Sequence, residues 1–383
     1  MFVILERNAH VVSGHEHSQL LAIRSMAPDV DYKLLQAKEA GETENAILCS
    51  DRETKKNPVE SLEQDVAAVS NYLNAQREDD VVVIVPNAGA FEVRLALELL
   101  QAVARTPLFV LRLLRPGDVD ALDDAEREQL RRQIASGHVQ LHTETVELTH
   151  FLNETHGMQA EDNFLLPCTL NPDVEVNRQR RGAGDPFRVG FLGVPRSEKG
   201  RRMMPAVLAA VAKTVSQTDP PVQFVMQRAP RSSLRLTPYV YEARCNWAVS
   251  RNSAVSIAWK SANLSDDDFR ETFVNLDMLL LPYNRKAYAH RGSGMIIDGV
   301  LAGVPVLHSK GMAMANVLKH AGFAAETPED FAQQIARFSK PGAEDGFQPA
   351  AAREHLFAQF DRTRILLTSL AERQGECAAR RGE

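Results

Sequence analysis

The chain's strongest candidate for chemistry is the stretch LPYNRKAYAHRGSGMIIDGVLAGVPVL at residues 281–307. It joins the end of an apolar strand to a basic loop and then to an apolar helix. Small residues at the helix start would let a ligand reach the backbone N–H groups of Ser293, Gly294 and Met295, which suit a phosphate. Asp298 follows about one turn later. Its carboxylate could accept hydrogen bonds from vicinal hydroxyls, or it could serve only as an acid favourably placed near a helix start.

A second candidate anion site is the segment FLGVPRSEKG at residues 191–200. Gly193 ends a strand, Gly200 precedes a helix, and Arg196 and Lys199 lie in the turn between them. A strand, a tight turn and a helix N-terminus offer N–H donors to an anion, and two cations would add charge-assisted bonds. The alternative is a surface turn whose cations are simply solvated.

The N-terminal stretch NAHVVSGHEHSQLLAI at residues 8–23 is a third candidate. A strand runs into a loop that contains Gly14 and His15, and a helix follows. The pair His15 and His17 has the H-x-H spacing that can hold Zn or Ni, but no third ligand has a suitable spacing. The sequence therefore predicts no metal site.

Short apolar runs alternate with longer segments of helical period, which is typical of a parallel sheet covered by helices. The predicted strands are 2–6, 32–35, 46–50, 82–87, 108–114, 139–143, 164–167, 187–194, 222–227, 254–259, 277–283 and 304–308. The predicted helices include 59–76, 89–105, 119–135, 144–156, 197–216, 265–275, 294–302, 311–320, 328–339 and 354–373.

The alternation stops at NPDVEVNRQRRGAGDP and then restarts, which predicts an α/β protein with two Rossmann-like domains facing a cleft. The expected parts are an N-terminal domain at 1–170, a linker at 171–186, a second domain at 187–350 and a C-terminal helix and tail at 351–383.

Composition narrows the classes of partner. The 383 residues carry a net charge of -6, which argues against a nucleic-acid binder that depends on a basic face. No apolar run is long enough for a membrane helix, and the first residues lack the pattern of a signal peptide. We expect a cytoplasmic protein with at most peripheral membrane contact.

Four motifs also occur in the order found in a known family: GVPRSEKG at 193–200, LLLPY at 279–283, RGSG at 291–294 and DGVLAGVPVL at 298–307. The second half resembles the donor domain of glycosyltransferases with the GT-B fold, in particular the retaining family 4 type, or group 1 glycosyltransferases. The resemblance implies that the C-terminal helix crosses back to the N-terminal domain. It also implies that the donor is a nucleotide diphosphate sugar and that no metal or other cofactor is needed.

The resemblance assigns roles residue by residue. Lys199 matches the lysine that binds the diphosphate, and Val194 stands where the family has an arginine, so Arg196 would act in its place. His290 and Asp298 occupy the two acidic positions of the family's E-x7-E pair, which contact the sugar and the ribose respectively. The residues expected around the nucleotide are Gly14, His15, Arg291, Gly292, Ser293, Gly294, Met295 and Asp298.

The resulting hypothesis is a hexosyltransferase of polysaccharide biosynthesis, bacterial in type. It would move a sugar to a glycan, lipid-linked or protein acceptor, with retention. A catalytically degenerate binding or scaffold protein of the same fold is the alternative, motivated by His290 and Val194. A nicotinamide-dependent oxidoreductase is a third possibility, although no G-x-G-x-x-G follows the first strand of either half.

Overall fold

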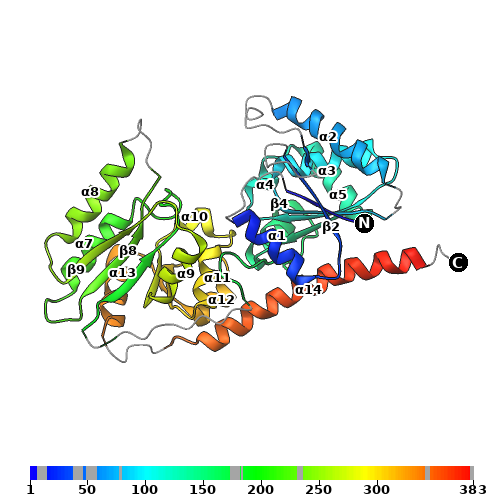
Figure 1. Cartoon of the computed structure of the whole chain (residues 1–383). Helices are drawn as coiled ribbons and strands as arrows, with labels where there is room; N and C mark the ends of the chain where they lie inside the picture. The colour runs from blue at the N-terminus through cyan, green and yellow to red at the C-terminus, as the bar shows by residue number, and fades with distance from the viewer. Residues whose placement is uncertain are drawn as a thin grey trace. The chain divides into compact units, whose positions relative to one another are not determined.

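The computed structural model describes residues 1–6, 15–37, 46–48, 58–76, 80–172, 182, 184–230, 236–340 and 346–379. Contacts between Cα atoms divide the chain into two compact units. The first unit comprises Met1–Pro167, His290–Gly292 and Ala358–Glu383. The second comprises Cys168–Ala289 and Ser293–Phe357. Both are α/β units. In Figure 1 the first is coloured from blue to teal, with its C-terminal segment in red, and the second is coloured from green to orange.

The first unit is built on a six-stranded parallel sheet with the order β3-β2-β1-β4-β5-β6. Its strands are β1 (Phe2–Leu5), β2 (Tyr32–Ala37), β3 (Ala46–Leu48), β4 (Val82–Ala88), β5 (Leu108–Leu113) and β6 (Val139–Thr143). The chain leaves β3 at one edge and returns beside β1, so the direction of winding reverses between β1 and β4. This is the strand order of a dinucleotide-binding Rossmann sheet.

Helices cover both faces of this sheet. They are α1 (His15–Met26), α2 (Pro58–Ala75), α3 (Ala90–Ala102), α4 (Gly117–Asp120), α5 (Asp124–Ala135), α6 (Val146–His156) and the long α14 (Pro349–Ala379). Alternate residues of β1 serve the two faces: Val3 packs in the cluster with α2, α3, α5 and α6, and Ile4 packs in the cluster with α1 and α14. The expected return of the C-terminal helix to the N-terminal domain is confirmed, because Leu367 and Leu370 of α14 belong to the second of these clusters.

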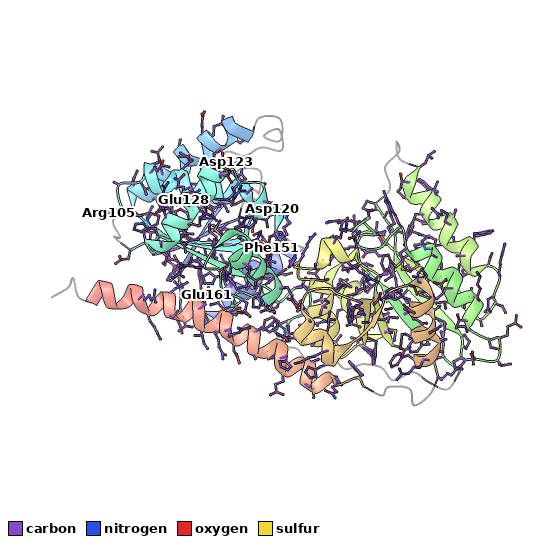
Figure 2. The ribbon with its side chains drawn as sticks, turned by 180° about the vertical axis from the view of Figure 1, so that it is seen from behind. Arg105, Asp120, Asp123, Glu128, Phe151 and Glu161 are labelled. Atoms are coloured by element: carbon purple, nitrogen blue, oxygen red, sulfur yellow. The ribbon has the colours of Figure 1, made fainter. Side chains whose placement is uncertain are left out.

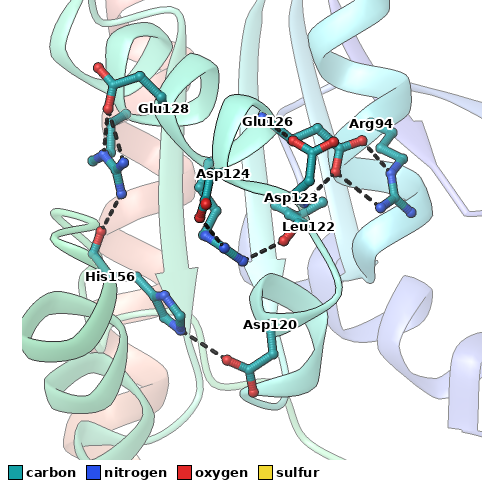
Figure 3. A network of polar contacts seen from close by, with 10 residues as sticks. Arg94, Asp120, Leu122, Asp123, Asp124, Glu126, Glu128 and His156 are labelled. Carbon is teal, nitrogen blue, oxygen red and sulfur yellow. Dashed lines mark hydrogen bonds and ion pairs between the residues drawn. The ribbon is translucent and has the colours of Figure 1, made fainter.

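Polar contacts tie the outer helices of the first unit together (Figure 3). Arg94 of α3 donates to Glu126 of α5 at 2.6 and 3.0 Å, and the Arg131 guanidinium of α5 reaches the carbonyl of His156 at 2.9 Å. The imidazole of His156 lies 2.9 Å from the carboxylate of Asp120 on α4. These contacts are partly exposed and fix helix positions more than they add stability.

The second unit repeats the same topology with the order β12-β11-β10-β7-β8-β9. Its strands are β7 (Phe187–Phe191), β8 (Val222–Gln227), β9 (Val255–Lys260), β10 (Met278–Leu281), β11 (Val306–Ser309) and β12 (Gly322–Ala325). Its helices are α7 (Met204–Thr214), α8 (Thr237–Val249), α9 (Asp266–Val274), α10 (Arg285–Tyr288), α11 (Gly294–Leu301), α12 (Ala315–Ala321) and α13 (Pro328–Phe338). Helices α7, α8 and α13 share one buried cluster with the sheet. All pairings between neighbouring strands are parallel, so this unit is again α/β as predicted.

Several details differ from the sequence prediction. Residues 164–167 were expected to form a strand, but they run as irregular buried chain. The N–H of Phe164 donates to the carbonyl of Thr143 at 3.2 Å, but no strand ladder follows. Thr363 of α14 instead accepts from the N–H of Leu165 at 2.9 Å. Helix α8, the short helix α10 and strand β12 were not predicted. The segment 119–135, predicted as one helix, forms the end of α4 and helix α5.

Candidate functional site

The carboxyl ends of β7 and β10 are the place where the second sheet can bind a ligand. These two strands are neighbours, with Met278 aligned with Val189 and Leu279 with Gly190. The chain winds in opposite directions on either side of them, and crevices at such a reversal are the usual ligand sites of open α/β sheets. The turn after β7 and the loop after β10 therefore leave the sheet at the same edge, and both carry residues that the sequence singled out.

The turn after β7 is shaped around a lysine. Gly193 has a φ of 82°, which favours glycine. A Cβ atom on Gly193 would lie only 3.1 Å from the ammonium nitrogen of Lys199, so the missing side chain leaves room for that cation. The N–H of Gly193 donates to Gln227 Oε1 at 2.7 Å, and Gln227 in turn donates to the carbonyl of Ala262 at 2.8 Å. The position of Lys199 is thus set by a hydrogen-bonded turn.

The same turn is locked to the chain that follows β10. Gly200 has a φ of 84°, and a Cβ there would lie 2.1 Å from the carbonyl oxygen of Pro282. The N–H of Asn284 donates to the carbonyl of Glu198 at 2.9 Å. Any larger residue at position 200 would force these segments apart. Arg196, in contrast, has a side chain that is 58% exposed, and its guanidinium lies 4.0 Å from the carboxylate of Glu198.

A helix begins where the sequence predicted a phosphate site. Helix α11 begins after Ser293, whose side chain makes no capping hydrogen bond. The first N–H groups of a helix have no partner within it, so those of Gly294 and Met295 carry donor capacity. Every residue from Met295 to Leu301 is buried, which makes α11 a core helix whose N-terminus lies at the ligand edge of the sheet.

Asp298 lies on α11 but is buried. Its side chain is 1% exposed, and Oδ1 accepts hydrogen bonds from the N–H groups of Thr169 and Leu170 at 3.0 and 2.9 Å. Oδ2 has no hydrogen-bond partner. Burial raises the pKa of the Asp298 carboxyl to about 7, against the lowering effect of the two backbone donors. The carboxylate expected at the ribose therefore holds the backbone of residues 169 and 170 in this structure.

His290 and its neighbours belong to the first unit, although they precede α11 directly. The Nδ1–H of His290 donates to the carbonyl of Glu147 at 3.0 Å, because a carbonyl can only accept. Thr145 donates to the carbonyl of His290 at 2.9 Å. The imidazole also lies against the ring of Phe151, with centroids 4.9 Å apart; Phe151 is labelled in Figure 2. The structure thus places His290 against the start of α6.

Gly292 permits a close approach within the first unit. A Cβ at Gly292 would lie 2.4 Å from Glu144 Oε1, so only glycine fits beside this carboxylate. Arg291 is half-buried between His290 and Gly292. Of the expected residues, these three lie together in the first unit, whereas Lys199, Arg196, Ser293, Gly294, Met295 and Asp298 belong to the second.

Sequence reasoning assigned no role to the residue that holds Glu144. Arg112 is 1% exposed and donates to Glu144 Oε2 at 2.8 Å, to the carbonyl of Pro86 at 2.9 Å and to the carbonyl of Phe164 at 2.8 Å. A buried guanidinium with this many acceptors fixes the ends of β4 and β6. The signal was a single arginine inside the apolar strand LFVLRLL.

The remaining expectations fall mostly outside the described residues. Gly14 lies outside them, and His15 is the first residue of α1, with no description of its side chain. The H-x-H alternative therefore also falls outside the described side chains. Elsewhere, the described part of the chain holds no group of three or more His, Cys, Asp or Glu that could bind a metal ion. No described helix has the length and apolar composition needed to cross a bilayer.

A cavity of about 480 Å³ lies in the first unit along β6 and α14. Its lining includes His142, Arg362 and Glu161, the last of which is labelled in Figure 2. Burial lowers the pKa of His142, and its Nδ1 lies 2.5 Å from Asn163 Oδ1. The elements around this cavity carry none of the expected site residues, so we do not identify it with the donor site.

Two parallel Rossmann-type units, joined by a C-terminal helix that packs on the first, define the GT-B fold, and the comparison with solved structures agrees. A glycosyltransferase from Rickettsia africae ESF-5 is 12% identical, with 98% of this chain and 97% of that chain covered and a TM-score of 0.63. A trehalose-6-phosphate protein from E. coli bound with UDP-2-fluoro glucose is 11% identical and has a TM-score of 0.70. The match covers 96% of this chain and 98% of that chain. Anabaena Alr3699/HepE in complex with UDP and glucose is 11% identical and has a TM-score of 0.54. The match covers 94% of this chain and 99% of that chain.

At this identity the likeness shows the fold alone. No protein-family profile matches the chain, and no curated protein sequence matches it either.

Proposed function

We propose that the protein is a glycosyltransferase that takes a sugar from a nucleotide diphosphate sugar bound in the second unit. The observation that carries this proposal is the turn after β7, where Gly193 leaves space for the ammonium group of Lys199 at the reversal point of the sheet. The loop after β10 leads from the same edge to the N-terminus of α11. A cation and a helix start at one sheet edge are suited to a diphosphate.

The chemistry follows from where charge develops. As the bond between the sugar and the diphosphate breaks, negative charge grows on the departing phosphate oxygens. Lys199 and the N–H groups of Gly294 and Met295 would stabilise that charge, and their fixed positions mean that they need not reorganise during the reaction. We propose that transfer needs no metal or other cofactor. Arg196 would be a secondary cation. Its side chain is 58% exposed, so no buried contact holds it in place for a ligand as the turn holds Lys199.

We keep ribose recognition as the proposed role of Asp298. Oδ2 of this residue is a buried acceptor without a hydrogen-bond partner, and a ribose hydroxyl would supply the missing donor. Because the side chain is 1% exposed, contact with a nucleotide requires the chain at residues 169 and 170 to shift. Solved structures of similar fold were determined with UDP-2-fluoro glucose or with UDP and glucose, which supports a uridine nucleotide as the first donor to test.

The finer assignment remains part of the proposal. We propose a hexosyltransferase of the retaining family 4 type that acts in the cytoplasm on a glycan, lipid-linked or protein acceptor, as in polysaccharide biosynthesis. A bacterial source fits that assignment. Gly14, His15, His290, Arg291 and Gly292 keep their proposed roles in binding the nucleotide sugar.

Calorimetric titration with UDP and GDP, followed by turnover assays with their sugars, tests this proposal. We expect one nucleoside diphosphate to bind and Lys199→Ala to lower turnover more than affinity, since its charge is needed most as the diphosphate leaves. Lys213→Ala, on an exposed position of α7, is the matched control and should change neither. Gly294→Val should block binding by filling the helix start. Binding that survives both Lys199→Ala and Gly294→Val unchanged would place the donor elsewhere.

A catalytically inactive binding protein is the second candidate. The observation that favours it is the position of His290, which is engaged with Glu147 and Phe151 where the family has a sugar-binding glutamate. This candidate predicts nucleotide binding without transfer or hydrolysis of any UDP- or GDP-sugar. Release of free nucleotide from any of these sugars would exclude it, and stabilisation by NAD or NADP instead would point to the oxidoreductase alternative.

A further inference from the structure

Helix α8 of the second unit carries an unusual apolar surface. In the described part of the chain, six large hydrophobic side chains are exposed, and four of them lie on or directly before this helix. They are Leu236 (77% exposed), Tyr239 (47%), Val240 (55%) and Trp247 (64%). The other two, Leu21 and Ile365, lie on separate helices. Clusters of exposed apolar side chains mark interaction surfaces more often than single ones do.

The exposed side chains follow one stripe of the helix. Positions 236, 240, 243 and 247 are spaced by four, three and four residues, so they share one face, and all four are exposed. The opposite face of α8 packs Tyr241, Cys245 and Ala248 into the core of the second unit. Burial of that inner face anchors the helix and leaves the outer stripe in place. We call this stripe, together with Tyr239, the α8 surface.

The exposed charged residues of the segment 236–251 have one sign. Between residues 236 and 251 the exposed charged residues are Arg244 and Arg251, with no acid among them. Glu242 is buried and ion-paired with Arg228 at 3.4 Å. Arg251 lies over the ring of Trp247, 4.8 Å from its centroid. The whole chain has a net charge of -6, so this basic, aromatic surface is a local feature.

We propose that the α8 surface binds the headgroup region of an anionic lipid bilayer. Tryptophan and tyrosine favour the boundary between headgroups and acyl chains, and arginines beside them are attracted to anionic lipids. Charge complementarity favours this partner, because Arg244 on the helix and Arg251 just after it are the exposed charged residues of this segment and both are positive. A stable protein–protein interface buries about 800 Å² on each partner, more than one stripe of a single helix offers. In this proposal the helix lies in the plane of the interface.

Sedimentation of the full-length protein with vesicles tests the proposal. Vesicles of phosphatidylglycerol and phosphatidylcholine should bind the protein, and pure phosphatidylcholine should bind it much more weakly. Arg244→Gln and Arg251→Gln should each weaken binding roughly fivefold, and Trp247→Ser should weaken it on both kinds of vesicle. Ile365→Ser is the matched control, since Ile365 on α14 is also 64% exposed, and it should bind like the parent.

Fluorescence gives an independent readout. The chain has two tryptophans, Trp247 and Trp259, so Trp259→Phe leaves Trp247 as the single reporter. Its emission should shift to the blue when anionic vesicles are added and be quenched by brominated lipid. Three results would overturn the proposal: equal binding to neutral and anionic vesicles, binding unaffected by Trp247→Ser, or a concentration-dependent dimer that Trp247→Ser abolishes. The last would assign the α8 surface to a second copy of the chain.

Discussion

Replacing Asp298 by asparagine should change how stability depends on pH. Burial raises the pKa of the Asp298 carboxyl from its ordinary value of 3.8 to about 7, so the folded state holds the proton more tightly than the unfolded state does. The stability contributed by this group is therefore complete below about pH 4 and falls as the pH rises towards 7. At ~1.4 kcal/mol per pKa unit, the full loss is about 4 kcal/mol, of which ~2–3 kcal/mol falls between pH 5 and pH 8.

Asparagine keeps an oxygen for the N–H groups of Thr169 and Leu170 but carries no charge at any pH. The parent should thus lose ~2–3 kcal/mol of folding stability between pH 5 and pH 8 that Asp298→Asn does not lose. Relative to the parent, the variant should become more stable as the pH rises. Thermal unfolding would show it as a relative shift of roughly 5–10 °C in melting temperature.

Asp330→Asn is the control. Asp330 also accepts from two backbone N–H groups, but the pKa of its exposed carboxyl is lowered by them, so its effect should be flat over this range. An equal difference for Asp298→Asn at both pH values would refute the assignment of a buried, proton-binding carboxyl.

Two further substitutions test the packing around the site. Gly200→Ala should destabilise the protein by at least ~2 kcal/mol more than the control Gly311→Ala in thermal unfolding. Both glycines have positive φ, but only a Cβ at position 200 would clash with the Pro282 carbonyl. Equal losses of stability would mean that Gly200 is not packed against Pro282. Arg112→Met should cost ~3–5 kcal/mol, since it leaves Glu144 and two carbonyls without their buried donor. The partly exposed pair of Arg94 and Glu126 is the comparison, and its loss in Arg94→Met should cost about 1 kcal/mol or less.

Most of the strands could be predicted because they are buried on both faces. Runs such as VVVIV and MLLL have no polar residue to place on a solvent face, and the structure forms β4 and β10 there. Helix α8 was not predicted, for a related reason. Its inner and outer faces are both apolar, so TPYVYEARCNWAV shows no clean helical period. Strand β12 is only four residues long, and its small residues GFAA carry little strand propensity.

The site was predictable only where a local rule decided the outcome. Gly193, Lys199 and the start of α11 follow from strand ends and helix starts, which a sequence displays directly. The contacts of His290 with Glu147 and Phe151 join residues about 140 positions apart in the sequence, and no local pattern reports them. The buried bonds of Arg112 are of the same kind, since Phe164 is 52 residues away.

Asp298 shows why a motif position does not by itself fix a role. A carboxylate binds whichever donors reach it, and here the N–H groups at 169 and 170 bind Oδ1. A ribose could therefore reach the buried Oδ2 only if that chain shifts. The ammonium group of Lys199 is placed differently: its turn is shaped by two glycines of positive φ and by Gln227, at the reversal point of the sheet. Each of these constraints would be unnecessary for a solvated surface cation. Lys199→Ala therefore tests the donor site more directly than any change at Asp298, whose loss would alter stability and binding together.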